Sequence, residues 1–110
     1  MAELVTLAQV NLALKLDLTQ SGSPLAFTDE RTPDIELKMD QAEAAILDYL
    51  KVGADEWTAE TVPAQVTAAI ILAVKGLYDG NDALLAGLYD NERTNPIVGL
   101  LQRLRDPALA

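Results

Sequence analysis

The clearest candidates for chemistry are carboxylates on one helical stretch. Glu36, Asp40 and Glu43 recur at spacings of three and four residues, which places them on one face of a helix. Two carboxyl groups in a pocket can share general acid and base work when their pKa values are separated. The chain has 17 acidic residues among 110, so such pairs also arise by chance. We therefore interpret these residues, together with Asp48, as the solvated face of a helix.

A second acidic stretch has part of the spacing of a calcium-binding loop. Its polar residues are Asp79, Asn81, Asp82 and Asp90. Counted from Asp79, Asp90 falls at the twelfth position, where such a loop places a ligand. Leu84 occupies the sixth position, which requires glycine, and Ala83 occupies the fifth, which requires a ligand. These departures predict that no metal is bound there.

The remaining residue types give little basis for catalysis. The sequence has no histidine and no cysteine, which removes the commonest general base and any thiol chemistry. Acidic helical chains of this length include acyl carrier proteins, whose attachment serine follows an aspartate and starts a helix. Ser21 and Ser23, in QSGSPL, have neither feature. With no glycine-rich phosphate loop and no nucleophile–base pair, the sequence predicts a non-enzymatic protein without cofactor or metal.

Length and composition predict a single domain, residues 1–110. Half of the residues are hydrophobic, which suffices for a core without disulfides or metal. The net charge of −9 repels nucleic-acid phosphate and anionic membranes, so we expect protein partners and no membrane association. The opening residues, MAELVTLAQV, lack the basic segment and long apolar run of a signal peptide, which favours a cytoplasmic origin.

The stretch from Thr61 to Gly80 is predicted to form a buried central helix. Pro63 suits a first helical turn, and Gly80 suits a left-handed residue after the last turn. Apolar residues recur at three- and four-residue steps and cover most of the surface of this helix. Lys75 interrupts the run, which is too short to span a bilayer. The predicted core residues of this helix are Val66, Ile70, Val74 and Leu77.

Two further helices are predicted before the central one. The first covers Thr6 to Leu16, with Thr6 as N-cap, and packs on the periphery of the core. The second covers Pro33 to Leu50, with Thr32 as N-cap and Gly53 as a stop. Its predicted core residues are Ile35, Met39 and Ile46.

The polar connection between these two helices, residues 17–32, is rich in turn-forming residues. It contains Leu25 and Phe27, which either tether the loop to the core or contact a neighbouring subunit. Trp57 lies in the segment that joins the two main helices. It either covers the core or contributes to a subunit interface, a common place for tryptophan. The sequence leaves both questions open.

A last helix is predicted to begin at Pro96, capped by Asn95, and to end before Pro107. It follows the polar break 89–95, so it can swing away and bury its apolar stripe on a partner. We therefore expect an all-α fold, a small helical bundle over about residues 1–94 that includes the loop 17–32. Residues 95–110 form a C-terminal docking helix and tail.

The order of these pieces resembles the small head–tail connector (adaptor) family of tailed bacteriophages, also found in prophages and gene transfer agents. The matching positions are Val62-Pro63, Ala69 to Leu72, Leu77-Tyr78, Leu100-Leu101 and Arg105-Asp106-Pro107. The similarity covers nearly the whole chain and rests on hydrophobic and turn positions. The chain departs from the family in the loop 17–32, where members often run directly into an Asp-rich helix start.

This resemblance implies a structural protein of the virion neck, assembled in the cytoplasm of a bacterial host. Family members form a ring, usually twelvefold, below the portal protein. The ring extends the DNA channel and meets a stopper or tail-completion protein, and DNA passes without sequence-specific binding. The C-terminal helix commonly docks on the portal. Carried over by position, the portal-binding residues are Ile97, Leu100, Leu101, Arg103, Leu104 and Arg105.

The net charge is compatible with two interpretations. In a ring of identical acidic subunits, the acidic residues would face the channel or the outside, and a negative channel would keep DNA from adhering. Alternatively, the charge simply keeps a small domain soluble. The second interpretation suits the alternative function, a small acidic helical adaptor or regulator that binds one protein partner without catalysis.

Overall fold

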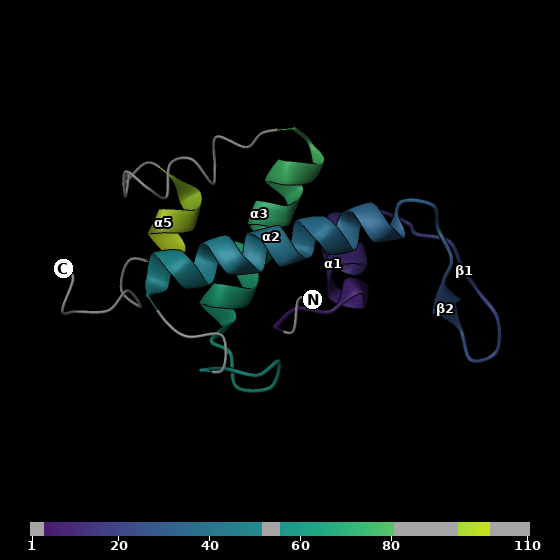
Figure 1. Ribbon diagram of the computed structural model, residues 1–110, viewed down its shortest axis with the longest axis horizontal. Helices are drawn as coiled ribbons and strands as arrows, with labels where there is room; N and C mark the ends of the chain where they lie inside the picture. The colour runs from purple at the N-terminus through teal and green to yellow at the C-terminus, as the bar shows by residue number, and fades with distance from the viewer. Residues whose placement is uncertain (1–3, 52–55, 81–94, 102–110) are drawn as a thin grey trace.

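The computed structural model describes residues 4–51, 56–80 and 95–101. Within these ranges helices dominate, which confirms the all-α prediction, and one small β-hairpin is added (Figure 1). The central helix, α3, contacts α1, α2 and α5. In chain order, the elements are α1 (Leu7–Leu14), β1 (Gln20–Ser21), β2 (Ala26–Phe27), α2 (Thr32–Leu50), α3 (Ala64–Tyr78) and α5 (Pro96–Leu101).

Helix α3 carries the centre of the hydrophobic core. Val66, Ile70 and Val74 are fully buried, and Leu77 is partly buried against the same core. Pro63 is the N-cap rather than a first-turn residue, because its ψ of 145° is extended. Gly80 has the expected left-handed backbone, with a φ of 78°.

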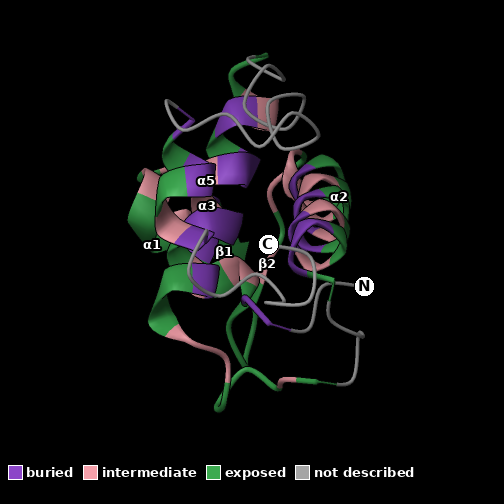
Figure 2. Cartoon of the chain, turned by 90° about the vertical axis from the view of Figure 1, so that its left-hand side faces the viewer, coloured by how far each residue is buried: buried purple, intermediate pink, exposed green. Residues whose placement is uncertain are grey.

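Helix α2 packs its apolar side against α3, with Ile35, Met39 and Ile46 buried. In Figure 2 the buried residues of α2 and α3 face each other. The prediction that Thr32 caps this helix is wrong, because Thr32 lies inside it and Arg31 is the N-cap. The carboxylate of Asp29 instead accepts a hydrogen bond from the Arg31 N–H, at 2.9 Å.

Helix α2 ends at Leu50, as predicted, although Lys51 rather than Gly53 is the residue that closes it. Lys51, with a φ of 62°, closes the helix in the left-handed conformation, and its N–H donates to the carbonyls of Asp48 and Leu47. The predicted stop, Gly53, lies outside the described residues. A lysine therefore takes the position that glycine most often fills at the end of a helix.

One residue of the predicted solvated acidic face is buried. Glu43 is 9% exposed, and its Oε1 accepts a hydrogen bond of 2.7 Å from the N–H of Leu4. Leu4 and Val5 are themselves buried, so the N-terminal segment lies against the bundle. The carboxylate satisfies a backbone N–H that would otherwise be buried without a partner. For Glu43 the solvated-face prediction is therefore wrong, while Asp48 is exposed.

Helix α1 begins as predicted and ends two residues early. The Thr6 hydroxyl accepts from the Gln9 N–H at 3.1 Å, and the Gln9 side chain accepts from the Thr6 N–H at 2.8 Å. The helix ends at Leu14 because Lys15 turns left-handed, with a φ of 53°. Val10 is its one fully buried residue.

The connection 17–32 contains structure that the sequence pattern did not predict. β1 and β2 pair antiparallel, with Gln20 opposite Phe27 and Ser21 opposite Ala26. Gly22, with a φ of 94°, supplies the left-handed turn residue. The hairpin projects beyond the helices at one end of the molecule, far from α5 at the other (Figure 1).

Helix α5 packs on α3 at that other end. The Asn95 side chain accepts a hydrogen bond of 2.8 Å from the Ile97 N–H, consistent with its predicted capping role. Ile97, Val98 and Leu101 are fully buried, and Leu100 is partly buried. None of the described helices combines the length and the apolar character needed to cross a bilayer.

Candidate functional site

Two open pockets lie at the hairpin end of the molecule. Asn11, Leu12, Lys15 and Asp17 line the first, at the C-terminal end of α1. The second lies at the base of the hairpin and is lined by Thr19, Thr28, Asp29, Glu30 and Arg31. Both are open to solvent rather than enclosed.

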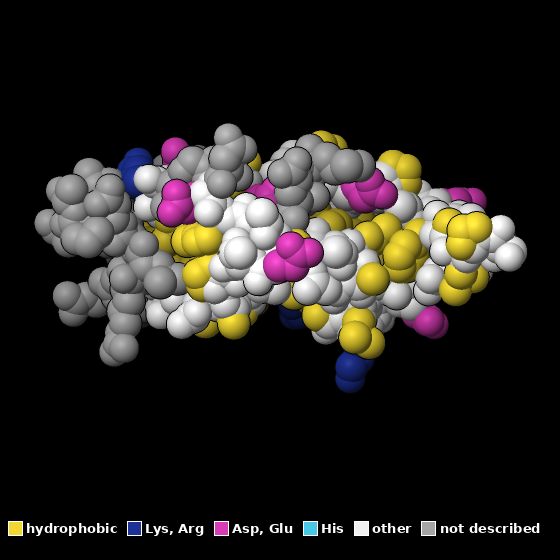
Figure 3. Space-filling model, turned by 90° about the horizontal axis from the view of Figure 1, so that it is seen from below, with side chains coloured by type: hydrophobic (Ala, Val, Ile, Leu, Met, Phe, Trp, Pro, Cys, Tyr) yellow, Lys and Arg dark blue, Asp and Glu magenta, His cyan; other side chains and the backbone are white. Residues whose placement is uncertain are grey.

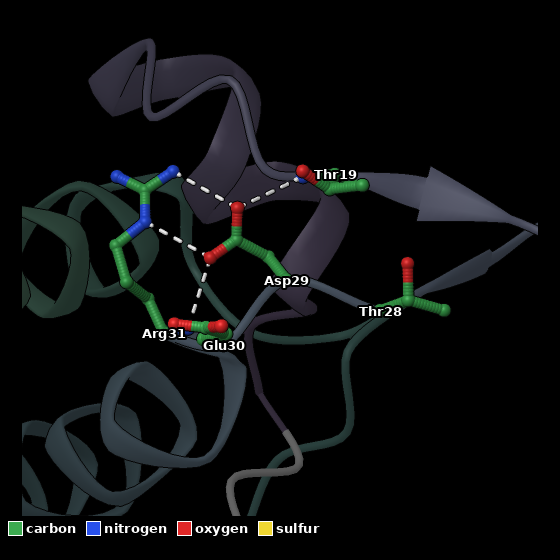
Figure 4. Close-up of a pocket in the computed structure, with 5 residues that line it drawn as sticks. All are labelled: Thr19, Thr28, Asp29, Glu30 and Arg31. Carbon is green, nitrogen blue, oxygen red and sulfur yellow. Dashed lines mark hydrogen bonds and ion pairs between the residues drawn. The ribbon is translucent and has the colours of Figure 1, made fainter.

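Arg31 joins the hairpin base to the helices (Figure 4). Its Nε donates to Asp29 Oδ1 at 3.0 Å and its Nη2 to Asp29 Oδ2 at 3.2 Å, a two-pronged ion pair. Nη1 donates to the Tyr78 hydroxyl at 3.0 Å, and Nη2 also donates to the Leu16 carbonyl at 2.9 Å. One guanidinium thus ties together the turn after α1, the start of α2 and the end of α3.

Asp29 accepts two further hydrogen bonds from backbone N–H groups, those of Arg31 at 2.9 Å and Thr19 at 3.1 Å. The hydrogen bonds from the Arg31 side chain, then those from the backbone of Arg31 and Thr19, hold the pKa of Asp29 well below its usual range. Asp29 and Tyr78 in turn raise the pKa of Arg31. Both groups stay charged at neutral pH, so the ion pair persists there and fixes the base of the hairpin.

The hairpin therefore has a fixed base and an exposed tip. At the base, the Thr28 N–H donates to the Thr19 carbonyl at 2.9 Å, and the Leu18 N–H donates to the Asn11 side chain at 2.9 Å. Phe27 is partly buried against the core, which corresponds to the tether interpretation. Leu25, at the tip, is 65% exposed, so the structure separates two residues that the sequence analysis treated together.

Trp57 is partly buried and packs against the hydrophobic core. This is the position expected of a lid over the core. Its predicted role at a subunit interface stays a prediction.

The predicted portal-binding residues fall into two groups. Ile97 and Leu101 are fully buried within the chain's own core, and Leu100 is partly buried. Arg103, Leu104 and Arg105 lie outside the described residues. The apolar stripe of α5 is thus already covered by the chain itself, with α3 as the helix that it contacts.

A charge asymmetry escaped the analysis by motifs. Residues 4–28 contain only two charged residues, Lys15 and Asp17, whose formal charges cancel. This neutral segment forms α1 and the hairpin, whereas the acidic excess lies elsewhere in the sequence. A residue-by-residue count of charge along the sequence would have found it.

Within the described ranges, no group of three or more His, Cys, Asp or Glu side chains is arranged to hold a metal ion. Most of the calcium-loop-like stretch, residues 81–90, lies outside those ranges. Comparisons of the chain with protein-family models, with curated proteins and with solved structures gave no match.

Proposed function

We propose that this chain is a structural protein of a phage-like particle, in which it forms a ring between the portal and a stopper or tail-completion protein. The observation that carries the proposal is a helical body with a projecting, uncharged hairpin whose base is fixed and whose tip is exposed. Such an arm suits contact with another protein better than it suits chemistry. The order of helices and turn residues that resembles the connector family supports the same function.

The distribution of charge also supports a ring around DNA. Acidic side chains such as Asp34 and Asp48 are exposed on α2. A channel with negative walls does not retain the DNA backbone, so the genome can pass through it. The neutral segment 4–28 then remains available for contacts between copies.

Portal binding belongs, in this proposal, to the C-terminal segment. Ile97 and Leu101 hold α5 on α3, because withdrawing them from the core would expose apolar surface. Leu100 is partly exposed, and Arg103, Leu104 and Arg105 follow it in the sequence. These four residues are the proposed portal contacts, with α5 serving as their anchor.

A truncation tests this assignment. A chain that ends after Leu101 keeps the buried residues of α5 and loses residues 102–110. We expect it to melt at the same temperature as the full chain and to leave purified portal undecorated in negative-stain images. The full chain should add a ring of density to the same portal. Undiminished decoration by the truncated chain would show that the portal contact lies elsewhere.

The alternative, an acidic adaptor that binds one partner, gains support from the burial of α5. Because the chain buries the apolar stripe of α5 itself, this helix leaves little exposed apolar surface for many copies to cover. The two functions differ in stoichiometry. Sedimentation with a partner protein should give many copies per complex for the ring, and one or two copies for the adaptor.

A further inference from the structure

We propose that the hairpin arm of one copy, residues 18–28, binds the α1 pocket of the next copy, lined by Asn11, Leu12, Lys15 and Asp17. This inference rests on the proposed ring and goes further by naming its subunit contact. The arm and the pocket are different surfaces, so each copy offers one and receives the other. Head-to-tail contacts of this kind close into rings when the rotation between copies fits.

Electrostatics selects a second copy as the occupant. Each chain carries a net charge of −9, so most relative orientations of two copies bring like charges together. The arm contains no charged residue, and neither does α1, Leu7–Leu14. Lys15 and Asp17 in the pocket cancel each other. A contact between these two surfaces therefore brings no net repulsion between copies, whereas a basic partner would be attracted to the acidic remainder of the chain.

Exposed apolar side chains mark the same two surfaces. Leu25 on the arm is 65% exposed and Leu12 on α1 is 80% exposed. Leu37, on α2, is the other large hydrophobic residue exposed within the described ranges, and it lies between charged neighbours. Seen from below, the end of the molecule that carries the hairpin has hydrophobic and uncharged atoms at its tip (Figure 3). Contact between Leu25 and Leu12 would remove both from water.

Both surfaces are held in place before contact. The Arg31–Asp29 ion pair and the Thr19 and Thr28 hydrogen bonds fix the base of the arm. The pocket is shaped by left-handed Lys15 and Asp17, with φ of 53° and 56°, and by Asn11, which accepts hydrogen bonds from the Leu16 and Leu18 N–H groups. Preorganised surfaces lose little conformational entropy on binding, which lets a small contact contribute to assembly.

Cysteine cross-linking tests the contact directly, because the chain has no cysteine of its own. Leu12→Cys and Leu25→Cys are made as separate chains with tags of different length and mixed with portal under mild oxidation. We expect the disulfide between the two chains to form at least tenfold faster than the disulfide between Leu25→Cys and a Leu37→Cys control. Equal rates for Leu12→Cys and Leu37→Cys would overturn the proposal.

Charge substitutions give a second, independent test. Leu25→Asp disables the arm and Leu12→Asp disables the pocket, while both sites are exposed and the melting temperature should stay unchanged. Each variant alone should remain monomeric under conditions in which the wild type assembles. Mixed together, they retain one intact arm and one intact pocket, so they should form a 1:1 pair that grows no further.

The outcomes separate this inference from the proposed function. If the wild type forms rings on portal and either variant alone does so equally well, the arm–pocket contact is wrong and the connector function stands. If the wild type forms no ring with or without portal, and the mixed variants form no pair, both proposals are overturned.

Discussion

The two ends of this molecule use apolar residues in opposite ways. At one end, α5 turns Ile97, Val98 and Leu101 into the core and contacts α3. At the other, the hairpin exposes Leu25 to solvent while a network of hydrogen bonds around Arg31 fixes its base. The first end is stabilised by burial, and the second by polar contacts together with the partly buried Phe27.

This difference teaches which end is prepared to meet a partner. An amphipathic helix such as α5 signals that one face will be covered, but its own chain can cover it. The hairpin has no such internal partner at its tip, where residues 21–26 are all exposed. The sequence pattern of α5 suggested docking more strongly than that of the loop, and the structure makes the loop the more accessible of the two.

Ile70→Asp is expected to cause the largest loss of stability. It should disrupt both ends of the molecule, because it breaks α3, the helix that supports them. Ile70 is fully buried at the centre of α3. An unpaired charge there costs several kcal/mol or more, comparable with the ~5–15 kcal/mol total stability of a small domain. Circular dichroism should show no cooperative melting transition. A melting temperature equal to that of the wild type would refute the central position of α3.

The comparison between the ends is tested by Ile97→Ala and Leu25→Ala. Removing a buried isoleucine side chain costs about 2–5 kcal/mol, because a cavity remains. The exposed Leu25 leaves no cavity, so its truncation should change the free energy of unfolding by less than about 0.5 kcal/mol. Urea unfolding of both variants measures the difference. If both variants lost a similar free energy of unfolding, the two ends would not differ in how they use apolar residues.

A smaller loss of stability is expected from the hairpin base when the pH falls. The pKa of Asp29 is lower in the folded protein than in the unfolded chain, where it is about 4. Its carboxylate therefore stabilises the fold above pH ~4, and this contribution is lost as the pH falls below that value. Asp29→Asn should be less stable than the wild type at pH 6. The difference between their free energies of unfolding should become smaller toward pH 2.

The matched control for that experiment is Asp48→Asn, since Asp48 is exposed on α2. Its stability relative to the wild type should vary little between pH 6 and pH 2. Urea unfolding at several pH values provides the measurement. If the difference in free energy of unfolding between Asp29→Asn and the wild type stayed constant across this pH range, the assigned role of the carboxylate would be contradicted.

The smallest loss of stability is expected from changes to the N-cap of α1. Thr6→Ala removes the hydroxyl that accepts from the Gln9 N–H and should cost ~1 kcal/mol. Gln9→Glu keeps the reciprocal hydrogen bond to the Thr6 N–H and should be nearly neutral. Thermal unfolding of the two variants distinguishes them, and equal losses would argue that the capping box adds nothing to α1.

Local signals in the sequence were enough for the positions and buried sides of the main helices, but not for every cap, since Thr32 lies inside α2 and Pro63 is the N-cap of α3. The three- and four-residue spacing of Val66, Ile70 and Val74 predicted the buried side of α3, because burial follows helical periodicity. Thr6 and Gly80 were assigned from their conformational preferences and take those roles. These features depend on residues close together in the chain.

The features that escaped prediction depend on contacts between distant residues. Glu43 is buried because the N-terminal segment, 39 residues away in sequence, brings the Leu4 N–H to it. The hairpin depends on a bond from the Thr19 N–H to Asp29, ten residues on, rather than on a run of strand-forming residues. The apolar stripe of α5 did not reveal whether its own chain or a partner would cover it.

Native mass spectrometry of the purified wild-type chain, alone and with portal, tests the central claim most directly. We predict closed assemblies of a single stoichiometry, at high concentration or on the portal, each built only from this chain or from this chain and portal. A chain that stays monomeric under both conditions, or that carries a bound small molecule instead, would contradict a ring-forming structural role.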